Sequence, residues 1–529
     1  MPTIRSPRFR LYRFAMIALL ATIPWPAWSG DEGQITLPSF EFSPDMPWLN
    51  VSKPIRLSEL KGKVVVLDFW TYGCINCVHV LEDLKTLETK YHPYLAVIGV
   101  HTPKFDREKE LKALRNIVVR YGIEHPVVND VEFRAGRYYG MRAWPTQVVI
   151  DPQGIPLGKV IGEGNLDILD SAIAKLIEEQ KDRLDPTPLP ISLESEKLER
   201  SPLAAPGKVT ISGRYVAISD TLHNRVVLAD RSGKVLQVFG GPKPGHADGN
   251  AINARFSSPQ GIVINGNKIY VADTGNHLIR ALDIVSEDVT TIAGDSSMEQ
   301  PRQGKFKAME IGLRSPWGLA IKDEKLYIAM AGSHQIWRLN LATGELSDYA
   351  GSGREGLQDG SLSTSRFSQP SGLSIQGDWL FVADAEDSAI RRINLKDEKV
   401  ETLVGAGLFD FGDVDGSFDE ARLQHVLGIA AIDAYRVIAA DTYNHKIKLL
   451  DLRKKTVSTL PLKSPSTDAS QHEPPRLDEP GGLTVDGNLV LIADTNNNRI
   501  MAYDIVSGVL SPWKIDRLNT RHLALPNNR

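Results

Sequence analysis

The residues best suited to chemistry are Cys74 and Cys77, the only two cysteines in the 529 residues. They follow the β-branched segment 64–69 directly and open a stretch whose apolar residues recur at helical spacing. A strand, a Cys-x-x-Cys pair and a helix, in this order, are typical of a dithiol–disulfide redox site. We expect the helix N-terminus to point its free N–H groups and positive dipole end at the first sulfur. This would stabilise the thiolate, which is the form that attacks a disulfide.

Two other interpretations of the pair are half of a zinc site and a structural disulfide. Zinc needs four ligands, and with no second Cys pair in the sequence His79 and His101 would have to complete the set. A disulfide across two intervening residues closes a very small loop and gains little entropy. Redox chemistry is therefore favoured, with the Cys74–Cys77 disulfide as the redox centre and with no other cofactor and no metal.

Two further positions are expected to belong to the redox site. Asp68 lies six residues before Cys74 on the same predicted strand, where an inward-facing carboxylate would accept the proton of Cys77. The alternative is an Asp exposed to water at the end of a strand. Pro145 precedes the apolar strand 146–151, and a proline in this position is often cis. Such a proline would leave a backbone edge free to pair with an incoming peptide.

The predicted neighbours of the site are Trp70, His101, Trp144 and Thr146. His101 ends the strand 95–100, which should run parallel to the strand that carries the cysteines, and ligands meet such sheets at the carboxyl ends of the strands. A hydrogen-bonding role and a proton-transfer role are both open for His101. His79 lies on the helix after Cys77 and is predicted to be solvated.

The first 29 residues are predicted to be a secretory signal. Four arginines precede a ten-residue apolar core that is too short to span a bilayer, and Ala27 and Ser29 are small residues at the positions that a signal peptidase reads. We expect a periplasmic or otherwise exported protein. The alternative is an uncleaved anchor, which would hold the domains at the membrane but outside the cytoplasm.

The charge balance argues against nucleic acid as a partner. The formal net charge of −4 would become −8 without the four arginines of the signal. A mildly acidic exported protein is a poor nucleic-acid binder. With only two cysteines, the domains must be held together by core burial, and both thiols are free for chemistry.

The chain is long enough for three or four average domains, but its pattern indicates two. Residues 36–180 alternate strand-like and helix-like segments, which predicts an α/β domain with a mixed sheet. Helices are expected at 77–91, 108–121 and 167–179. The distance from Cys77 to Pro145 leaves room for an extra helix–strand unit. Residues 181–205 are rich in Pro and charge and are predicted to be a linker, although their stretch ISLESEKL also suits a strand of the next domain.

Residues 206–516 form six repeats, and residues 517–529 follow as a C-terminal tail. The repeats begin at Gly207, Gly261, Gly318, Gly372, Gly428 and Gly482, between 54 and 57 residues apart. Each copy contains four short strand-like segments. Six units of four strands predict a closed six-bladed β-propeller, in which closure removes the exposed sheet edges.

Two polar positions recur in the repeats. An Asp ends the second strand in five copies, where it is predicted to cap backbone N–H groups. These are Asp220, Asp273, Asp384, Asp441 and Asp494, whereas the third copy has Met330. His277, His334 and His445 share one position near the turn that follows. They are suited either to turn packing, which is favoured, or to a metal in the central channel.

Three loops between blades carry an Asp-Gly pair followed, seven residues after the Asp, by an arginine. The arginines are Arg255, Arg366 and Arg422, and the aspartates are Asp248, Asp359 and Asp415. The simpler hypothesis is a turn braced by an ion pair between each Asp and its Arg. The alternative is a rim on one face of the disc that binds a partner protein.

The motifs DFWTYGCINC, IGVHTPKF, HPVVND, WPTQVVID and VIGEG, followed by repeats such as VADTGNHLIR, resemble the NHL repeat-containing protein 2 family. The resemblance covers about residues 40–515 and implies an α/β thioredoxin-like domain followed by an all-β six-bladed NHL propeller. It also implies that Cys74 is the nucleophile, Cys77 the resolving cysteine, Asp68 a buried acid/base and Pro145 a cis-proline. Ile75-Asn76 replaces the Gly-Pro of ordinary thioredoxins, so no redox potential follows.

Together these features predict an exported thiol–disulfide oxidoreductase that acts on a protein disulfide or dithiol, with a propeller that docks a partner protein. The alternative is a non-catalytic scaffold in which both domains are binding surfaces. A propeller hydrolase or lyase would need a convergent set of ligands on one rim, and the repeats show none. Contact with a membrane is expected only through an uncleaved signal.

Overall fold

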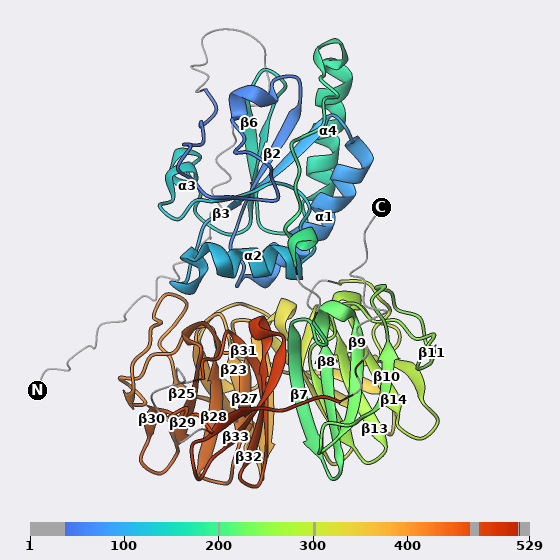
Figure 1. The fold of residues 1–529 in the computed structure, drawn as a ribbon, viewed down its shortest axis with the longest axis vertical. Helices are drawn as coiled ribbons and strands as arrows, with labels where there is room; N and C mark the ends of the chain where they lie inside the picture. The colour runs from blue at the N-terminus through green and yellow to red at the C-terminus, as the bar shows by residue number, and fades with distance from the viewer. Residues whose placement is uncertain (1–37, 199–200, 300–302, 466–474, 517, 519–529) are drawn as a thin grey trace, which may run out of the picture.

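The computed structural model describes residues 38–198, 201–299, 303–465, 475–516 and 518. A thioredoxin-like domain sits on one face of a six-bladed β-propeller, and helix α2 (Leu111–Arg120) lies along the boundary (Figure 1). The predicted signal, residues 1–29, lies outside the described residues, as does the tail 517–529 except for Leu518. Within the described ranges, no helix is long and apolar enough to cross a membrane.

The first domain is built on a six-stranded mixed sheet in the order β1-β4-β3-β2-β5-β6. Its strands are β1 Trp48–Leu49, β2 Val64–Trp70, β3 Leu95–His101, β4 Val127–Asn129, β5 Thr146–Ile150 and β6 Pro156–Ile161. The helices are α1 Ile75–Tyr91, α2 Leu111–Arg120, α3 Arg134–Tyr138 and α4 Leu166–Glu179. Every residue of β2, β3 and β5 is buried, as expected for strands covered on both faces. The predicted parallel pairing of β2 with β3 is confirmed, and β3, α2, β4 and α3 lie between α1 and Pro145, which leaves room for the predicted extra helix–strand unit.

The stretch ISLESEKL belongs to the first domain and gives no strand to the propeller. Ile191 forms an isolated antiparallel bridge with Val51, and the Ser192 N–H donates to the Asn50 carbonyl at 3.0 Å. The Asn50 side chain then caps the Glu194 N–H at 2.9 Å. The buried Asn50 amide thus holds the start of this segment beside β1.

The propeller has six sheets, numbered here as blades 1 to 6 in chain order. Blade 1 is β7 Pro206–Ser212, β8 Tyr215–Asp220, β9 Arg225–Asp230 and β10 Val235–Gly240. Blade 2 is β11 Gly249–Asn250, β12 Ile262–Asn265, β13 Lys268–Asp273, β14 Leu278–Asp283 and β15 Asp288–Ala293. Blade 3 is β16 Lys305–Lys307, β17 Pro316–Lys322, β18 Lys325–Met330, β19 Gln335–Asn340 and β20 Glu345–Ala350.

Blade 4 is β21 Gly360–Ser361, β22 Pro370–Gln376, β23 Trp379–Asp384, β24 Ala389–Asn394 and β25 Lys399–Val404. Blade 5 is β26 Gly416–Ser417, β27 Gly428–Ala431, β28 Arg436–Asp441, β29 Lys446–Asp451 and β30 Thr456–Thr459. Blade 6 is β31 Pro480–Asp486, β32 Leu489–Asp494, β33 Arg499–Asp504 and β34 Leu510–Pro512. Blades 2 to 5 therefore carry a short fifth strand at the outer edge, beyond the four that were predicted.

The last residues of the propeller help to close the ring. After β34, the chain crosses from blade 6 to blade 1, where Asp516 forms a parallel bridge with Lys234. The Asp516 N–H donates to the Gly233 carbonyl at 2.9 Å. Closure therefore combines blade packing with backbone hydrogen bonds between the two ends of the repeat region.

A ring of hydrogen bonds joins each blade to the next. In each blade, the turn after the second strand contains a residue with left-handed backbone conformation. Its side chain accepts a hydrogen bond from the backbone N–H of another left-handed residue, which lies just before the innermost strand of the following blade. The pairs, with donor second, are Asn224–Ser258, His277–Ser315, His334–Gln369, Ser388–His425, His445–Glu479 and Asn498–Ala205, at 2.8–3.2 Å. The last pair closes the circle.

The recurring glycines allow the innermost strands to approach one another at the axis. A Cβ atom built on Gly318 would lie 2.8 Å from the Ser371 carbonyl oxygen and 3.2 Å from Cα of Gly372. The same relation holds between Gly261 and Gly318, and between Gly372 and Gly428. Because the obstacles are backbone atoms, no side chain can move aside to make room.

We predict that Gly318→Ala destabilises the propeller by about 1–3 kcal/mol, because overpacked backbone must shift. Gly241→Ala is the control: its Cβ would meet nothing within 4 Å, so a change within about 0.5 kcal/mol is expected. Denaturant midpoints of the two variants measure the difference. Equal midpoints would show that the axis is not tightly packed.

Candidate functional site: a dithiol docked on the propeller

The two sulfurs lie at the N-terminus of α1, as the sequence predicts. Cys74 is the N-cap residue, and its Sγ accepts a hydrogen bond from the Cys77 N–H at 3.3 Å. Cys74 is partly exposed, whereas Cys77 is fully buried, and both are free thiols in this structure. Burial is the main reason why the pKa of Cys77 is raised well above its usual value, and the neighbouring Cys74 and Asp68 raise it further. The fold therefore leaves Cys74 partly exposed and buries Cys77.

Asp68 is fully buried in β2, not exposed at a strand end. One carboxylate oxygen accepts a hydrogen bond from Nε2 of Gln147 at 2.8 Å, and the other has no protein partner. Burial raises the pKa of Asp68 from 3.8 to about 6, although the Gln147 hydrogen bond opposes this shift. A carboxylate with such a pKa can exchange a proton near neutral pH.

The Trp144–Pro145 peptide bond is cis, as the sequence predicts. Trp144 Nε1 donates to Thr102 Oγ1 at 2.6 Å, and Thr146 Oγ1 donates to the Ala143 carbonyl at 2.8 Å. These bonds fix the segment around Pro145 just before β5. Trp144 packs on the same apolar cluster as Cys74.

His101 and Trp70 lie side by side at the ends of β3 and β2. His101 is fully buried, and its Nδ1 lies 2.9 Å from Asn129 Oδ1. Burial lowers its pKa to about 4, so the ring is neutral at physiological pH. Its ring stacks on Tyr72 with centroids 5.7 Å apart and meets Trp70 edge-on. This environment favours the packing and hydrogen-bonding role over proton transfer.

Glu108 holds the loop before the cysteines, a role that the sequence did not reveal. Its carboxylate accepts hydrogen bonds from the N–H groups of Gly73 (3.0 Å) and Lys104 (2.6 Å) and from the Thr71 hydroxyl. Because the side chain is fully buried, its pKa is raised to about 7. A Cβ on Gly73 would lie 3.0 Å from this carboxylate, so the glycine before Cys74 makes room for it.

The propeller contacts the same loop from the other side. Gln369, at the start of blade 4, bonds Gly73 and Ile75, the two residues that flank Cys74. Tyr72 meets Tyr443 of blade 5 edge-on, with ring centroids 5.3 Å apart. No sequence motif singles out Gln369, although its place before a proline matches that of Ser258, Ser315 and Glu479 in the other repeats.

Buried charges fasten the two domains together. Arg107 donates to Glu479 at 3.1 Å and to Asp478 at 2.7 Å, both in blade 6. Lys104 donates to the Glu386 carboxylate of blade 4 at 2.8 Å. Buried ions are tolerated only when paired in this way, so the docked arrangement satisfies charges that either domain alone would expose.

The prediction that His79 is solvated was wrong, because the propeller buries it. Its Nε2 lies 2.8 Å from Ser315 Oγ of blade 3, and its Nδ1 lies 2.6 Å from the Glu163 carboxylate, which also pairs with Arg314 at 2.5 Å. Serine, histidine and acid in this order recur in hydrolases. Here the Ser315 N–H, a potential oxyanion donor, is bonded to His277. Ser315, His79 and Glu163 therefore fit a hydrogen-bonded contact between the two domains better than a site with Ser315 as nucleophile.

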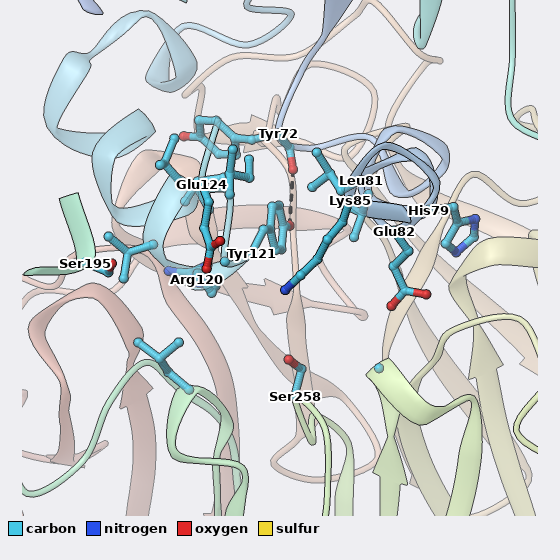
Figure 2. A pocket seen from close by; sticks show the side chains of 18 of the residues that line it. Tyr72, His79, Leu81, Glu82, Lys85, Arg120, Tyr121, Glu124, Ser195 and Ser258 are labelled. Carbon is cyan, nitrogen blue, oxygen red and sulfur yellow. Dashed lines mark hydrogen bonds between the residues drawn. The ribbon is translucent and has the colours of Figure 1, made fainter. Parts of the chain in front are cut away.

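A cavity of about 1110 Å³ lies beside the redox loop, between the first domain and the face of the propeller, and residues of all six blades line it. Figure 2 shows Glu82 and Lys85 of α1 pointing into it towards Ser258, and the Tyr121 hydroxyl bonded to the Tyr72 carbonyl. Gly73 and Ile75 line it, whereas neither sulfur does. The cavity thus adjoins the redox loop at the two residues that flank Cys74.

The recurring aspartates of the propeller cap backbone N–H groups, as predicted. Asp273, for example, accepts from the Ser257 N–H at 2.7 Å, and Asp384 accepts from the Ser368 N–H at the same distance. The three histidines at the shared turn position accept hydrogen bonds in the interblade ring through Nδ1. No group of three or more His, Cys, Asp or Glu side chains could hold a metal ion in the part of the chain that the structure describes.

The predicted pairs between the loop aspartates and Arg255, Arg366 and Arg422 were wrong. Asp248 pairs with Arg280 at 2.7 Å, Asp359 with Arg391 at 2.9 Å, and Asp415 with Lys448 at 2.8 Å. Each loop folds over its blade, so the carboxylate meets the third strand and not the arginine seven residues on. Arg255 bonds carbonyls of its own loop and Arg422 pairs with Asp410 at 2.6 Å.

Comparison with known proteins matches this two-part arrangement. A thioredoxin-like family model matches residues 62–155, and an NHL repeat model matches residues 256–282 and 477–503. NHL repeat-containing protein 2 of Gallus gallus is 41% identical over 521 residues, which cover 91% of this chain and 71% of that protein. The chain belongs to the NHL repeat-containing protein 2 family.

Two further relatives extend the family picture. The Arabidopsis thaliana protein SUPPRESSOR OF QUENCHING 1, chloroplastic, is 40% identical over 505 residues, or 88% of this chain and 47% of that protein. Thiol-disulfide oxidoreductase ResA of Bacillus thuringiensis (strain Al Hakam) is 32% identical over 124 residues, or 23% of this chain and 69% of that protein.

We predict that Asp68→Asn stabilises the protein at neutral pH. A raised carboxyl pKa means that the folded state loses stability as the pH rises from about 4 through about 6, and an amide does not ionise. The free energy of unfolding should exceed that of the parent by up to about 3 kcal/mol above pH 7, and the gain should vanish below pH 4. Denaturant unfolding at several pH values measures it. A pH-independent difference would contradict the assigned burial.

Proposed function

We propose that the protein is a thiol–disulfide oxidoreductase in which Cys74 attacks a disulfide and Cys77 resolves the intermediate. The observation that carries the proposal is the pairing of a partly exposed cysteine at the N-terminus of α1 with a buried second thiol. The buried Asp68 supports it, because its charge acts on Cys77 and its pKa of about 6 suits proton exchange.

The reaction balances without a further cofactor. The Cys74 thiolate attacks one substrate sulfur, the substrate S–S bond breaks, and the other substrate sulfur leaves as a thiolate. Cys77 then transfers its proton to Asp68 and attacks Cys74, which forms the Cys74–Cys77 disulfide and releases the second substrate thiol. Two electrons pass from the cysteine pair to the substrate. Run in reverse, the same steps oxidise a dithiol substrate.

The covered position of the loop bears on the kind of substrate. Tyr72, Gly73 and Ile75 are in contact with the propeller, so a substrate must reach Cys74 beside a second domain. Arg142 and Ala143, just before cis-Pro145, are exposed, and this segment would pair with an extended peptide. Flexible or extended disulfide segments therefore fit the site better than disulfides on a flat folded surface.

Trapping of the mixed disulfide tests the proposal. Incubated with a disulfide-bonded peptide, Cys77→Ser should accumulate a mixed disulfide on Cys74, because the resolving thiol is gone. Cys74→Ser should accumulate none, since Cys77 is buried. Asp68→Asn should form the mixed disulfide at nearly the parent rate but resolve it about tenfold or more slowly. Mass spectrometry of quenched samples follows each species, and equal trapping by both cysteine variants would contradict the assignment.

A non-catalytic scaffold is the second candidate, and the docking of the propeller on the redox loop favours it. In that case, a variant with both cysteines replaced by serine would capture the same protein partner as the parent. The rim that carries Arg255, Arg366 and Arg422 remains our proposed partner surface. Loss of capture in a triple Arg→Ser variant would support it, and unchanged capture would exclude it.

We also propose that the protein works outside the cytoplasm, as the segment 1–29 suggests. N-terminal sequencing of the mature protein, with a start at Gly30, would support a cleaved signal. An intact N-terminus in the membrane fraction would indicate the anchored alternative.

A further inference from the structure

Among the described residues, Gln369 is the only propeller side chain that forms hydrogen bonds to the backbone on both sides of Cys74. Its Oε1 accepts from the Ile75 N–H at 2.8 Å, and its Nε2 donates to the Gly73 carbonyl at 2.9 Å. A carbonyl only accepts and an N–H only donates, so these partners fix the orientation of the amide. The amide therefore pairs with the loop much as a neighbouring strand would.

The bond to Ile75 satisfies one of the free N–H groups at the start of α1. Because Gln369 is neutral, it does so without placing a negative charge beside Cys74. The Cys77 N–H remains bonded to Cys74 Sγ at 3.3 Å. The amide thus holds the backbone around the sulfur and leaves the positive end of the helix to the thiolate.

Gln369 is itself rigidly placed. It is 6% exposed and adopts a left-handed backbone conformation with φ of 61°. Its N–H donates to His334 Nδ1 at 3.1 Å in the interblade ring, and its carbonyl accepts from Ser371 Oγ at 2.8 Å. Pro370 then begins β22. The side chain is therefore anchored in blades 3 and 4 and not carried by a free loop.

We propose that Gln369 is a positioning residue of the redox site, through which the propeller fixes Cys74 at the N-terminus of α1. The purpose of this contact rests on the proposed oxidoreductase function, but its geometry can be tested without turnover. The thioredoxin-like domain would then carry an incomplete site that the propeller completes, which gives the fusion of the two domains a physical reason.

The chain offers a matched control in Gln424. It is also a buried glutamine of the interface, and its Oε1 accepts from the Arg107 N–H at 3.3 Å. It lies in blade 5, and its side chain bonds Arg107 and Asn444 rather than the loop 72–75. Loss of its amide should weaken docking to a similar degree without releasing Cys74.

The experiment measures the alkylation of Cys74 by iodoacetamide against pH in full-length Cys77→Ser protein, where Cys74 is the single thiol. Gln369→Met keeps the side-chain volume but removes both hydrogen bonds to the loop. The loop is then free to move, and Cys74 Sγ loses its hydrogen bond from the backbone N–H of residue 77. We expect the rate at pH 7 to fall about three- to tenfold. Gln369→Glu places a carboxylate beside Cys74, and a fall of about tenfold or more is expected. Gln424→Met should stay within about twofold.

Unchanged profiles in both Gln369 variants would overturn the proposal. An equal shift in Gln424→Met would also overturn it, because docking in general would then explain the effect. The outcome is independent of the proposed reaction. If the parent protein fails to reduce disulfides while the Gln369 profiles shift as expected, the positioning role stands and the oxidoreductase function falls. If the parent reduces disulfides and the profiles do not shift, the oxidoreductase function stands and the positioning role of Gln369 falls.

Discussion

The ring of left-handed residues at the blade junctions is the constraint on which both halves of the molecule depend. Each junction reverses the chain so that an acceptor in one blade meets an N–H at the start of the next. The same reversal turns the second residue towards the face that carries the first domain. The same backbone turn therefore joins neighbouring blades and directs a side chain towards the redox loop, and it recurs at each junction around the axis.

This explains why contacts with the redox domain come from equivalent positions. Ser315, Gln369, His425 and Glu479 occupy the same place in blades 3 to 6, and each meets a different part of the first domain. Ala205 and Ser258 are the corresponding residues of blades 1 and 2, and all six positions line the cavity between the two domains. The repeat supplies identical backbone positions, and substitution at them turns a symmetric ring into an asymmetric docking surface.

The docking itself relies on buried ionisable groups. Arg107 and Lys104 insert between carboxylates of the propeller, and burial raises the pKa values of Glu479 and Glu386 even though these cations lower them. If the two domains separated, water would have to solvate these charged side chains. In any other orientation of the domains, the charges would be buried without a partner. Such contacts favour one relative orientation of the domains more than they add stability. That orientation keeps Gln369 and His425 against Gly73.

Much of this arrangement followed from local sequence patterns. The strand before Cys74, the helix after it, the buried Asp68 and the cis-Pro145 depend on residues close in sequence or on one sheet, where side-chain period and strand order fix the outcome. The regular spacing of the repeats likewise determined the number of blades. Five of the leading glycines lie where the innermost strands approach closely, whereas in blade 1 Lys208 takes this place and Gly207 precedes it. The family resemblance rests on these same motifs.

Only the tertiary structure decided which side chains surround the redox loop and which partners the propeller loops find. The roles of Gln369, Glu108 and buried His79, and the true partners of Asp248, Asp359 and Asp415, depend on contacts between segments far apart in the chain. A single glutamine carries no periodicity or spacing signal, and a histidine on a helix looks solvated until another domain covers it. Sequence determines which surfaces each domain can build, whereas the packing of one surface on another decides which of their side chains meet.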